Sequence, residues 1–563
     1  MESHRFWGPL AMAAVGMLWG AACRGRTTDE PPDSGEDVAV PSVTTTDATS
    51  DRTVSDESPD VDESSAEVRT TESAAPDQAI LVGPTDAAAG GSAADDAAPE
   101  GTREASSVLV RPDGLVYIKP SNTKPGPTSN YSSSFDFSDA LALQGDTLVV
   151  GAPQESSNAS GINGDQSDDS VPSAGAVYVF TRSGSTWSQQ AYIKPSNGGS
   201  PMNFGWSVAL DGETLVVGAR EEASASTGVN GNQNDTSVSG DGAVYVFTRS
   251  GTTWSQQAYL KPAHTAPNQW CGFAVAVSGD TLAFSCPQDL PTAPDAANEV
   301  GSVYILTRTS GVWTQQAYLA PNAYGLGASL ALQGDLLAAG VPYQLSPADG
   351  SSRTQGGIVE VFSRSGTTWT QEALLSANLG PVGDRGPPSF DDKFGTSLAL
   401  SNGTLAVTAP EEAYPVDGSP NGWGGATYVF TRSGTAWSGQ ARLTALDAQL
   451  EPAATGGGFA NAIALDGDRL VVGAPRACPC VSTDLNELVS GQAALFTRGG
   501  TAWSWQSDSV LPHAPPGSYG FAVAVSGPTI AVGNPGDSSD AVGIDGDDTD
   551  TSSPGSGAVY VLP

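Results

Sequence analysis

Residues 204–220 read FGWSVALDGETLVVGAR, and residues 175–195 read GAVYVFTRSGSTWSQQAYIKP. Each segment consists of two apolar runs around a glycine-containing turn, which is the pattern of a β-hairpin. The first segment recurs along the chain, and a version of the second follows each copy after a long polar loop. The copies of the first segment begin at residues 137, 204, 273, 324, 394, 459 and 521. Self-comparison therefore predicts seven repeats of four strands, which we name A to D in chain order.

The last repeat lacks its own strand D. The chain reaches Pro563 after strand C of that repeat, whereas residues 115–120, LVYIKP, match residues 190–195, QAYIKP, of a complete strand D. The first strand of the folded region is therefore expected to complete the last repeat, which closes a ring and removes an exposed sheet edge. We predict that residues 107–563 form an all-β fold, a seven-bladed β-propeller of four-stranded blades. An open solenoid is the alternative, and the displaced strand argues against it.

The repeats resemble those of bacterial FG-GAP repeat proteins and, more distantly, the propeller of integrin α chains. The motif halves that carry the resemblance are Phe204-Gly205, Phe394-Gly395, Gly151-Ala152-Pro153 and Gly473-Ala474-Pro475. The resemblance implies a propeller whose ligands contact the face that bears the B–C and D–A loops. Integrin-type calcium loops between strands A and B are not implied, because that connection is a tight turn here, as at residues 210–213.

Composition limits the classes of function. The 563 residues carry 24 basic and 62 acidic side chains, a net charge of −38, and the sequence pI is about 4.1. Such a chain has no basic surface to displace counterions from phosphates, so no nucleic-acid partner is expected. The 67 glycines and 40 prolines, with few methionines, argue against a mostly helical fold.

The N-terminus is typical of an exported lipoprotein. Residues 1–22 are predicted to be a signal peptide, since a weakly basic start precedes an apolar run too short to span a bilayer. Small residues at Gly20 and Ala22 suit cleavage before Cys23, which resembles the lipidated cysteine of bacterial lipoproteins. An ordinary secretory signal with an incidental cysteine is the alternative. We expect the protein in the cell envelope, at the outer membrane or cell surface and held only by its lipid anchor, or else secreted.

Residues 23–106 are predicted to be a disordered acidic linker. Residues 24–105 contain 20 acidic and 5 basic residues, with no tryptophan, tyrosine or phenylalanine. This composition offers too little apolar surface to offset the entropy of ordering the chain. The linker would hold the folded region away from a membrane surface.

Three B–C loops share a pattern of oxygen-bearing side chains at positions i, i+2 and i+5. The residues are Asn163, Asp165 and Asp168; Asn230, Asn232 and Asp235; and Asp545, Asp547 and Asp550. Calcium prefers several hard oxygen donors from one tight loop, so these residues are a predicted calcium site. The loops belong to blades 1, 2 and 7, which are neighbours in a closed ring. Asx-turns that need no ion are the alternative.

Four cysteines follow Cys23. A hairpin with Ser278-Gly279 as its turn would place Cys271 opposite Cys286, and we predict a disulfide there, two reduced thiols being the alternative. Cys478 and Cys480 form either a strained local disulfide, a labile thiol pair or half of a metal site.

The predicted function is non-catalytic binding or adhesion by a monomer, with an unknown protein or glycan ligand at the loop face. The only histidines after the signal, His264 and His513, fall in D–A loops, and no catalytic grouping can be assembled around them from sequence. The tryptophans repeated from Trp187 to Trp503 and the arginines near them are expected to pack and brace the blades. The alternative is a carbohydrate-active enzyme that uses paired carboxylates on the loop face.

Overall fold

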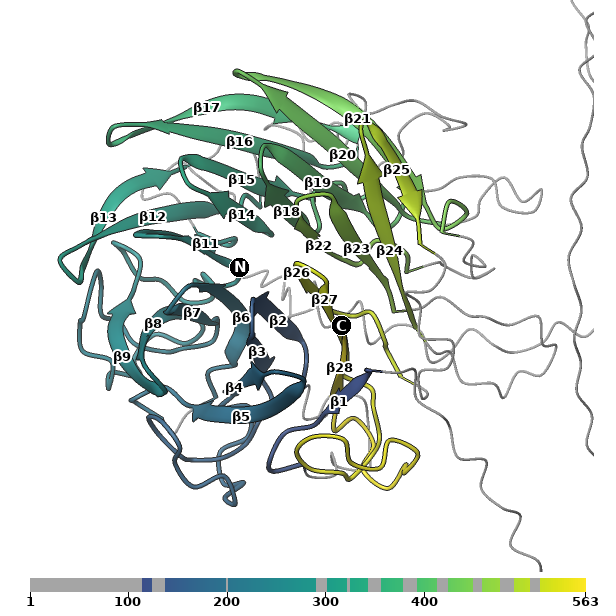
Figure 1. The fold of residues 1–563 in the computed structure, drawn as a ribbon. Helices are drawn as coiled ribbons and strands as arrows, with labels where there is room; N and C mark the ends of the chain where they lie inside the picture. The colour runs from purple at the N-terminus through teal and green to yellow at the C-terminus, as the bar shows by residue number, and fades with distance from the viewer. Residues whose placement is uncertain are drawn as a thin grey trace, which may run out of the picture. The chain divides into compact units, whose positions relative to one another are not determined.

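The computed structural model describes residues 114–123, 137–198, 201–289, 301–320, 325–342, 356–377, 392–412, 424–448, 458–475, 491–506 and 517–563. In these ranges 28 strands form seven four-stranded antiparallel sheets, arranged as blades (Figure 1). The predicted seven-bladed β-propeller is confirmed. No helix long and apolar enough to cross a membrane occurs in the described ranges.

The strands fall into four classes according to their order within each blade. The A strands are β2 (Ala140–Gln144), β6 (Phe204–Asp211), β10 (Val275–Ser278), β14 (Leu330–Gln333), β18 (Leu398–Ser401), β22 (Ala462–Asp466) and β26 (Val523–Ser526). The B strands are β3 (Thr147–Ala152), β7 (Thr214–Ala219), β11 (Thr281–Cys286), β15 (Leu336–Val341), β19 (Thr404–Ala409), β23 (Arg469–Ala474) and β27 (Thr529–Asn534). The C strands are β4 (Ala176–Ser183), β8 (Ala243–Ser250), β12 (Ser302–Thr309), β16 (Ile358–Ser365), β20 (Ala426–Ser433), β24 (Gln492–Gly499) and β28 (Ala558–Leu562). The D strands are β5 (Thr186–Ile193), β9 (Thr253–Leu260), β13 (Val312–Leu319), β17 (Thr368–Leu375), β21 (Ala436–Thr444), β25 (Ala502–Trp505) and β1 (Val116–Ile118).

The first strand completes the last blade, as predicted. Strand β1 lies beside β28 in the sheet order β1-β28-β27-β26, with Tyr117 opposite Tyr560 and Ile118 opposite Val559 (Figure 1). The A strands of successive blades contact one another around the ring, and β2 contacts both β26 and β6. The ring is therefore closed by main-chain hydrogen bonds between the two ends of the propeller.

The core lies between blades. Every residue of β3, TLVVGA, is buried, because each sheet packs on a neighbouring sheet through both of its faces. Val150 packs with Ala531 of blade 7, whereas Val149, the next residue along the strand, packs with Leu215 of blade 2. Since side chains alternate between the faces of a strand, a strand buried on both faces reads as a continuous apolar run.

The two halves of the FG-GAP motif meet at the boundary between blades. Gly205 has a φ of +91°, and its carbonyl oxygen lies against Gly151 of the preceding blade. A Cβ atom added to Gly151 would lie 2.2 Å from that oxygen, closer than any real contact. Glycine adopts this conformation without a steric penalty, which favours it at both positions, although Ser138 and Ala460 hold the place of Gly205 in two other blades with φ values of +83° and +66°.

The repeated arginines and tryptophans brace the face that carries the A–B and C–D turns. Arg249 donates from Nη1 to Thr147 Oγ1 of the preceding blade at 3.1 Å, and its guanidinium carbon lies 5.2 Å from the Trp254 ring centroid. Trp254 Nε1 donates to Gln190 Oε1, again across the blade boundary, at 2.8 Å. The corresponding bonds from arginine to threonine are Arg182–Thr529, Arg308–Thr214, Arg364–Thr281 and Arg498–Thr404. These residues hold blades together, as expected, and occupy the turn face.

Candidate functional site

The opposite face carries the B–C and D–A loops. The B–C loops of blades 1, 2 and 7, residues 153–175, 220–242 and 535–557, are described throughout. They have no regular strands beyond single bridges that extend each sheet, such as Ile162 with Ile193. Long loops on a rigid scaffold are where binding residues concentrate, so this face is the candidate functional site.

A buried ion pair anchors each of these loops. The pairs join the lysine that follows strand D to an acidic residue that follows strand B: Lys194–Glu155 at 2.7 Å, Lys261–Glu222 at 3.0 Å and Lys119–Asp537 at 3.0 Å. All six side chains are at most 1% exposed. Burial lowers the pKa of Lys194, and the Glu155 carboxylate opposes that shift. Lys261 also lies 2.5 Å from the buried Asp241, two residues before β8. Removing the lysine of a pair would leave a buried carboxylate without its cation, so each pair fixes its loop in one position.

A second set of bonds joins loops of successive blades. Asn122, which follows strand D of blade 7, donates to Gln166 O in the B–C loop of blade 1 at 3.2 Å. Asn197 does the same for Gln233 O in blade 2 at 2.5 Å, and it accepts a hydrogen bond from the Tyr245 hydroxyl at 2.7 Å. The loops of blades 7, 1 and 2 are thus linked in the order that ring closure predicts.

The first residue of each predicted calcium set extends a sheet. The side-chain Oδ1 of Asn163 accepts the backbone N–H of Tyr192 at 2.9 Å. Asn230 accepts from Tyr259 N, and Asp545 from Tyr117 N, each at 3.0 Å. Positive φ values near 55° at these three positions turn each side chain back toward strand D.

The last residue of each set closes its own loop. The Asp168 carboxylate accepts the backbone N–H groups of Asn158 and Ser170 at 3.1 and 2.9 Å, and Asp235 and Asp550 have the same pattern. The hydroxyl groups two residues later, as at Ser170, also donate to these carboxylates. Hydrogen bonding, from the Ser552 hydroxyl first, lowers the pKa of Asp550 to about 2.

The middle residues form local turns. Asp165 and Asp547 accept from the backbone and hydroxyl groups two residues later, and Asn232 accepts from Asn234 N at 3.2 Å. Within the described residues, no three His, Cys, Asp or Glu side chains converge as a metal site would require. In this arrangement the loop oxygens accept hydrogen bonds from groups of their own blade. Calcium binding stays a prediction.

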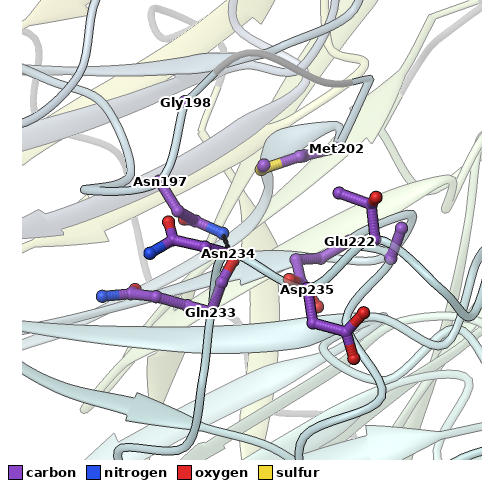
Figure 2. A pocket seen from close by; sticks show the side chains of 9 residues that line it. Asn197, Gly198, Met202, Glu222, Gln233, Asn234 and Asp235 are labelled. Carbon is purple, nitrogen blue, oxygen red and sulfur yellow. Dashed lines mark hydrogen bonds between the residues drawn. The ribbon is translucent and has the colours of Figure 1, made fainter.

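A small polar pocket lies between the D–A loop of blade 1 and the B–C loop of blade 2. Its volume is about 110 Å³, and Asn197, Met202, Glu222, Gln233 and Asp235 are among the residues that line it (Figure 2). The pocket is large enough for a few water molecules or a small polar group. It lies within the sector that the sequence singles out.

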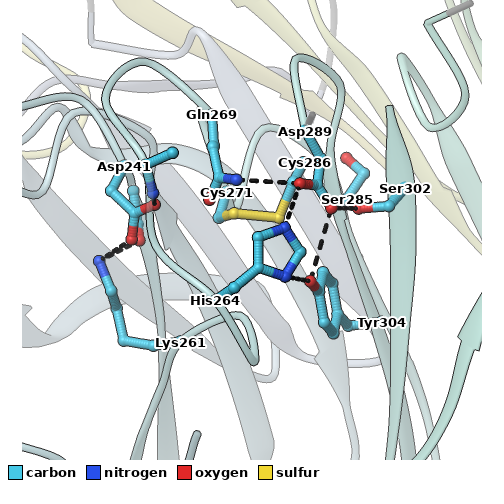
Figure 3. Close-up of a disulfide and its surroundings, with 12 residues drawn as sticks. Asp241, Lys261, His264, Gln269, Cys271, Ser285, Cys286, Asp289, Ser302 and Tyr304 are labelled. Carbon is cyan, nitrogen blue, oxygen red and sulfur yellow. Dashed lines mark hydrogen bonds and ion pairs between the residues drawn. A yellow bond between two sulfur atoms is a disulfide. The ribbon is translucent and has the colours of Figure 1, made fainter. Parts of the chain in front are cut away.

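Cys271 and Cys286 are joined by a disulfide in blade 3, with Cα atoms 4.0 Å apart (Figure 3). The hairpin register expected from a Ser278-Gly279 turn is wrong, because Ser278 pairs with Thr281. An irregularity restores the alignment of the cysteines: Gly272 N donates to Ser285 O at 2.9 Å, two residues out of step with the ladder. The same two-residue shift occurs in blade 2, where it accompanies the FG motif.

Cys271, rather than Phe273, therefore occupies the place of the FG phenylalanine. Cys271 forms a parallel β-bridge with Gly242, as Phe204 does with Gly175. Phe273 corresponds instead to Trp206, and Phe521 holds the same place in blade 7. These three aromatic residues line a cavity of about 320 Å³ between the A strands. Aligning the repeats by sequence similarity pairs Phe273 with Phe204 and therefore does not identify these three aromatic residues as a group. The cause is the two-residue shift, which lies within the motif.

Asp289 replaces the loop-anchoring glutamate in blade 3, close to the disulfide (Figure 3). Its buried carboxylate lies 2.6 Å from His264 Nε2 and accepts from Gln269 at 2.9 Å and Ser302 at 2.6 Å. His264 thus stands where Asn197 stands one blade earlier, and it links two blades. His513, Cys478, Cys480, Cys23 and the predicted signal and linker lie outside the described residues.

Comparison with protein families supports the repeat assignment. The family of FG-GAP repeats matches residues 187–247, which run from strand D of blade 1 to strand C of blade 2. The chain contains an FG-GAP repeat. The other blades have the same strand order as the matched segment, and the propeller fold with its FG-GAP repeat suggests a module of the binding or adhesion type. No match is found among curated proteins.

Proposed function

We propose that this FG-GAP propeller is an exported, lipid-anchored module that binds a protein or a glycan through its loop face without catalysis. The observation that carries the proposal is the rigid mounting of the loops by Lys194–Glu155, Lys261–Glu222 and Lys119–Asp537. Loops held in one conformation lose little entropy when a ligand binds. The turn face, in contrast, is occupied by the arginine and tryptophan braces.

The buried carboxylates favour binding over the enzymatic alternative. Glu155, Glu222 and Asp537 lie beneath the loop face and are paired with lysine. A glycosidase requires two carboxyl groups that reach the substrate, one of them protonated. We therefore assign these carboxylates to anchoring the loops.

Arrays of proteins and glycans, probed with the full chain, test the proposal. We expect retention of a ligand class, reduced by substitutions on the loop face and unchanged by Asp280→Asn in the exposed turn of blade 3. Retention lost only through the turn-face change would contradict the choice of face. Catalytic breakdown of a retained glycan would favour the enzyme.

Calcium dependence has a separate test. If the loops rearrange around calcium, millimolar calcium raises the melting temperature above its value in chelator, and Asp168→Asn with Asp550→Asn abolishes the rise. Equal melting temperatures in calcium and chelator would remove calcium from the proposal.

The anchor is tested through Cys23. Radiolabelled palmitate should enter the wild-type protein and not a Cys23→Ala variant, which should leave the membrane fraction. Membrane association that survives this change would refute a lipid anchor at Cys23.

A further inference from the structure

Blade 2 departs from the repeat at three neighbouring places. Arg220 replaces the proline of the GAP motif, which the other repeats retain as Pro153, Pro287, Pro342, Pro410, Pro475 and Pro535. Trp206 occupies a position held elsewhere by Asp139, Phe273, Ala328, Thr396, Asn461 and Phe521. Trp270, just before blade 3, corresponds to Asn203 before blade 2. Six other versions of the blade fold without this arginine, so the propeller itself does not require it.

These three residues meet in space. The guanidinium carbon of Arg220 lies 3.4 Å from the Trp206 ring centroid and 5.5 Å from that of Trp270. Arg220 directly follows β7, and Trp270 lies in the D–A loop before β10, so the cluster is at the loop-face end of the A strands. Trp206 also packs against Phe273, with ring centroids 5.9 Å apart.

Trp270 has an unfavourable backbone conformation. Its φ is +57°, in the left-handed region, where Asn203 has a φ of +50° in the preceding blade. Asparagine tolerates this region, whereas a bulky side chain there is strained by about 1–3 kcal/mol. Lys393, at the same place before Phe394, has a φ of +53°, so the repeat itself imposes this conformation, and Trp270 brings an aromatic side chain to it.

Arg220 retains hydrogen-bonding capacity. Its Nη2 atom donates to Glu221 Oε1 at 3.3 Å, and its buried Nε atom has no hydrogen-bond acceptor among the described residues. A buried donor without an acceptor is unfavourable by about 1–3 kcal/mol. Glu221 is 40% exposed, so an acceptor carboxylate lies beside these donors within reach of solvent.

Space for a ligand adjoins the cluster. Trp206 and Phe273 line the cavity of about 320 Å³ between the A strands, together with Phe521, which is 37% exposed. This volume is at the lower end of the range for small-molecule sites, about 300–1,000 Å³. Trp206 is the member of the cluster that lines this cavity, and Arg220, which stacks on Trp206, lies next to it together with the Glu221 carboxylate.

We infer that Trp206, Arg220, Glu221 and Trp270 bind a neutral saccharide, an inference that rests on the proposed function of the loop face. Sugar hydroxyl groups both donate and accept, so they match adjacent arginine and glutamate side chains. The apolar C–H face of a sugar ring packs against tryptophan. The net charge of −38 opposes the approach of an acidic ligand.

Titration of the full chain with short neutral oligosaccharides of glucose, mannose and N-acetylglucosamine tests the inference, with tryptophan fluorescence as the readout. A hexuronate oligosaccharide is the acidic counterpart. Arg220→Pro, Trp206→Thr and Trp270→Asn each restore a residue that the repeat uses elsewhere, so the blade is expected to fold. Each should weaken binding of a neutral probe at least tenfold without lowering the melting temperature.

Arg469→Thr is the matched control. Arg469 begins β23 on the turn face, where β3 and β7 begin with threonine, and its Nε is also buried without an acceptor among the described residues. This change should leave the affinity unaltered. Failure of every neutral probe to bind, or binding of the hexuronate alone, would overturn the inference. Neutral binding that is insensitive to the three substitutions would overturn this site while leaving the proposed function intact.

Discussion

The disulfide of blade 3 replaces a packing interaction that phenylalanine makes with tyrosine in blades 1, 2 and 5. In blade 2, Phe204 packs edge-on against Tyr245, with ring centroids 5.4 Å apart. In blade 3, Cys271 takes the place of Phe204, and Phe284 stacks on Tyr304 at 5.1 Å instead. Phe284 occupies the strand position that Val217 holds in blade 2. A large side chain has therefore moved from strand A to strand B.

Removing the bridge with Cys271→Ala and Cys286→Ala should destabilise the propeller. The bridge spans a separation of 15 residues, and closing a loop of that size contributes about 3 kcal/mol through the entropy of the unfolded chain. At about 2.1 cal/mol/K per residue over the roughly 450 residues of the propeller, this is a fall in melting temperature of about 3 °C. Reductant should lower the wild-type melting temperature by a similar amount.

The repeat supplies its own rescue variant. Cys271→Phe with Phe284→Val and Cys286→Ala installs the residues of blade 2, and a buried phenylalanine contributes about 1.5–3 kcal/mol. We expect this variant to regain most of the lost stability, and we expect its melting temperature to be the same with and without reductant. Calorimetry of the wild type, the double variant and the triple variant, with and without reductant, provides the comparison. A triple variant no more stable than the double variant would refute the substitution of a disulfide for aromatic packing.

Three further predictions concern the closure and the buried charges. Ile118→Ala in the closing strand removes a fully buried side chain and should lower the free energy of unfolding, measured with denaturant, by about 2–5 kcal/mol. An unchanged free energy of unfolding would show that the closing strand contributes little to stability. Lys194→Met leaves Glu155 buried without its cation and should lower the free energy of unfolding by about 3–5 kcal/mol. Adding Glu155→Leu should recover most of that stability. A double variant no more stable than Lys194→Met would contradict the pairing. Burial raises the pKa of Asp241 from 3.8 to about 6. Between those values the folded state holds a proton that the unfolded state releases, so stability falls as pH rises from 4 to 6, by up to about 1.4 kcal/mol per pH unit. The free energy of unfolding of the wild type, relative to that of Asp241→Asn, should fall over that range. A difference that stays constant with pH would show that Asp241 does not titrate there.

The number of blades and the way the ring closes are readable from the chain. Hairpin patterns are local, and the same pattern returns seven times, so the strand order needs no distant information. The match of residues 115–120 to strand D likewise identifies the partner of β28 without coordinates. The repeated arginines and tryptophans are recognisable as structural for the same reason, since a residue that every blade needs recurs in phase.

The arrangement of the loop face required the tertiary structure. A two-residue shift within the FG motif places Cys271, rather than Phe273, in the core, and a register shift depends on main-chain hydrogen bonds that residue patterns do not specify. The sequence pattern predicts calcium at the acidic loops, and only the structure shows that Asp168 and its counterparts accept hydrogen bonds from their own loops. Arg220 lies over Trp206 because strands A and B end side by side, and Trp270 joins them from the next blade. Sequence by itself determined the scaffold, because repetition encodes it. The proposed site arises from single departures from the repeat in one strand and two loops, and only folding brings them together.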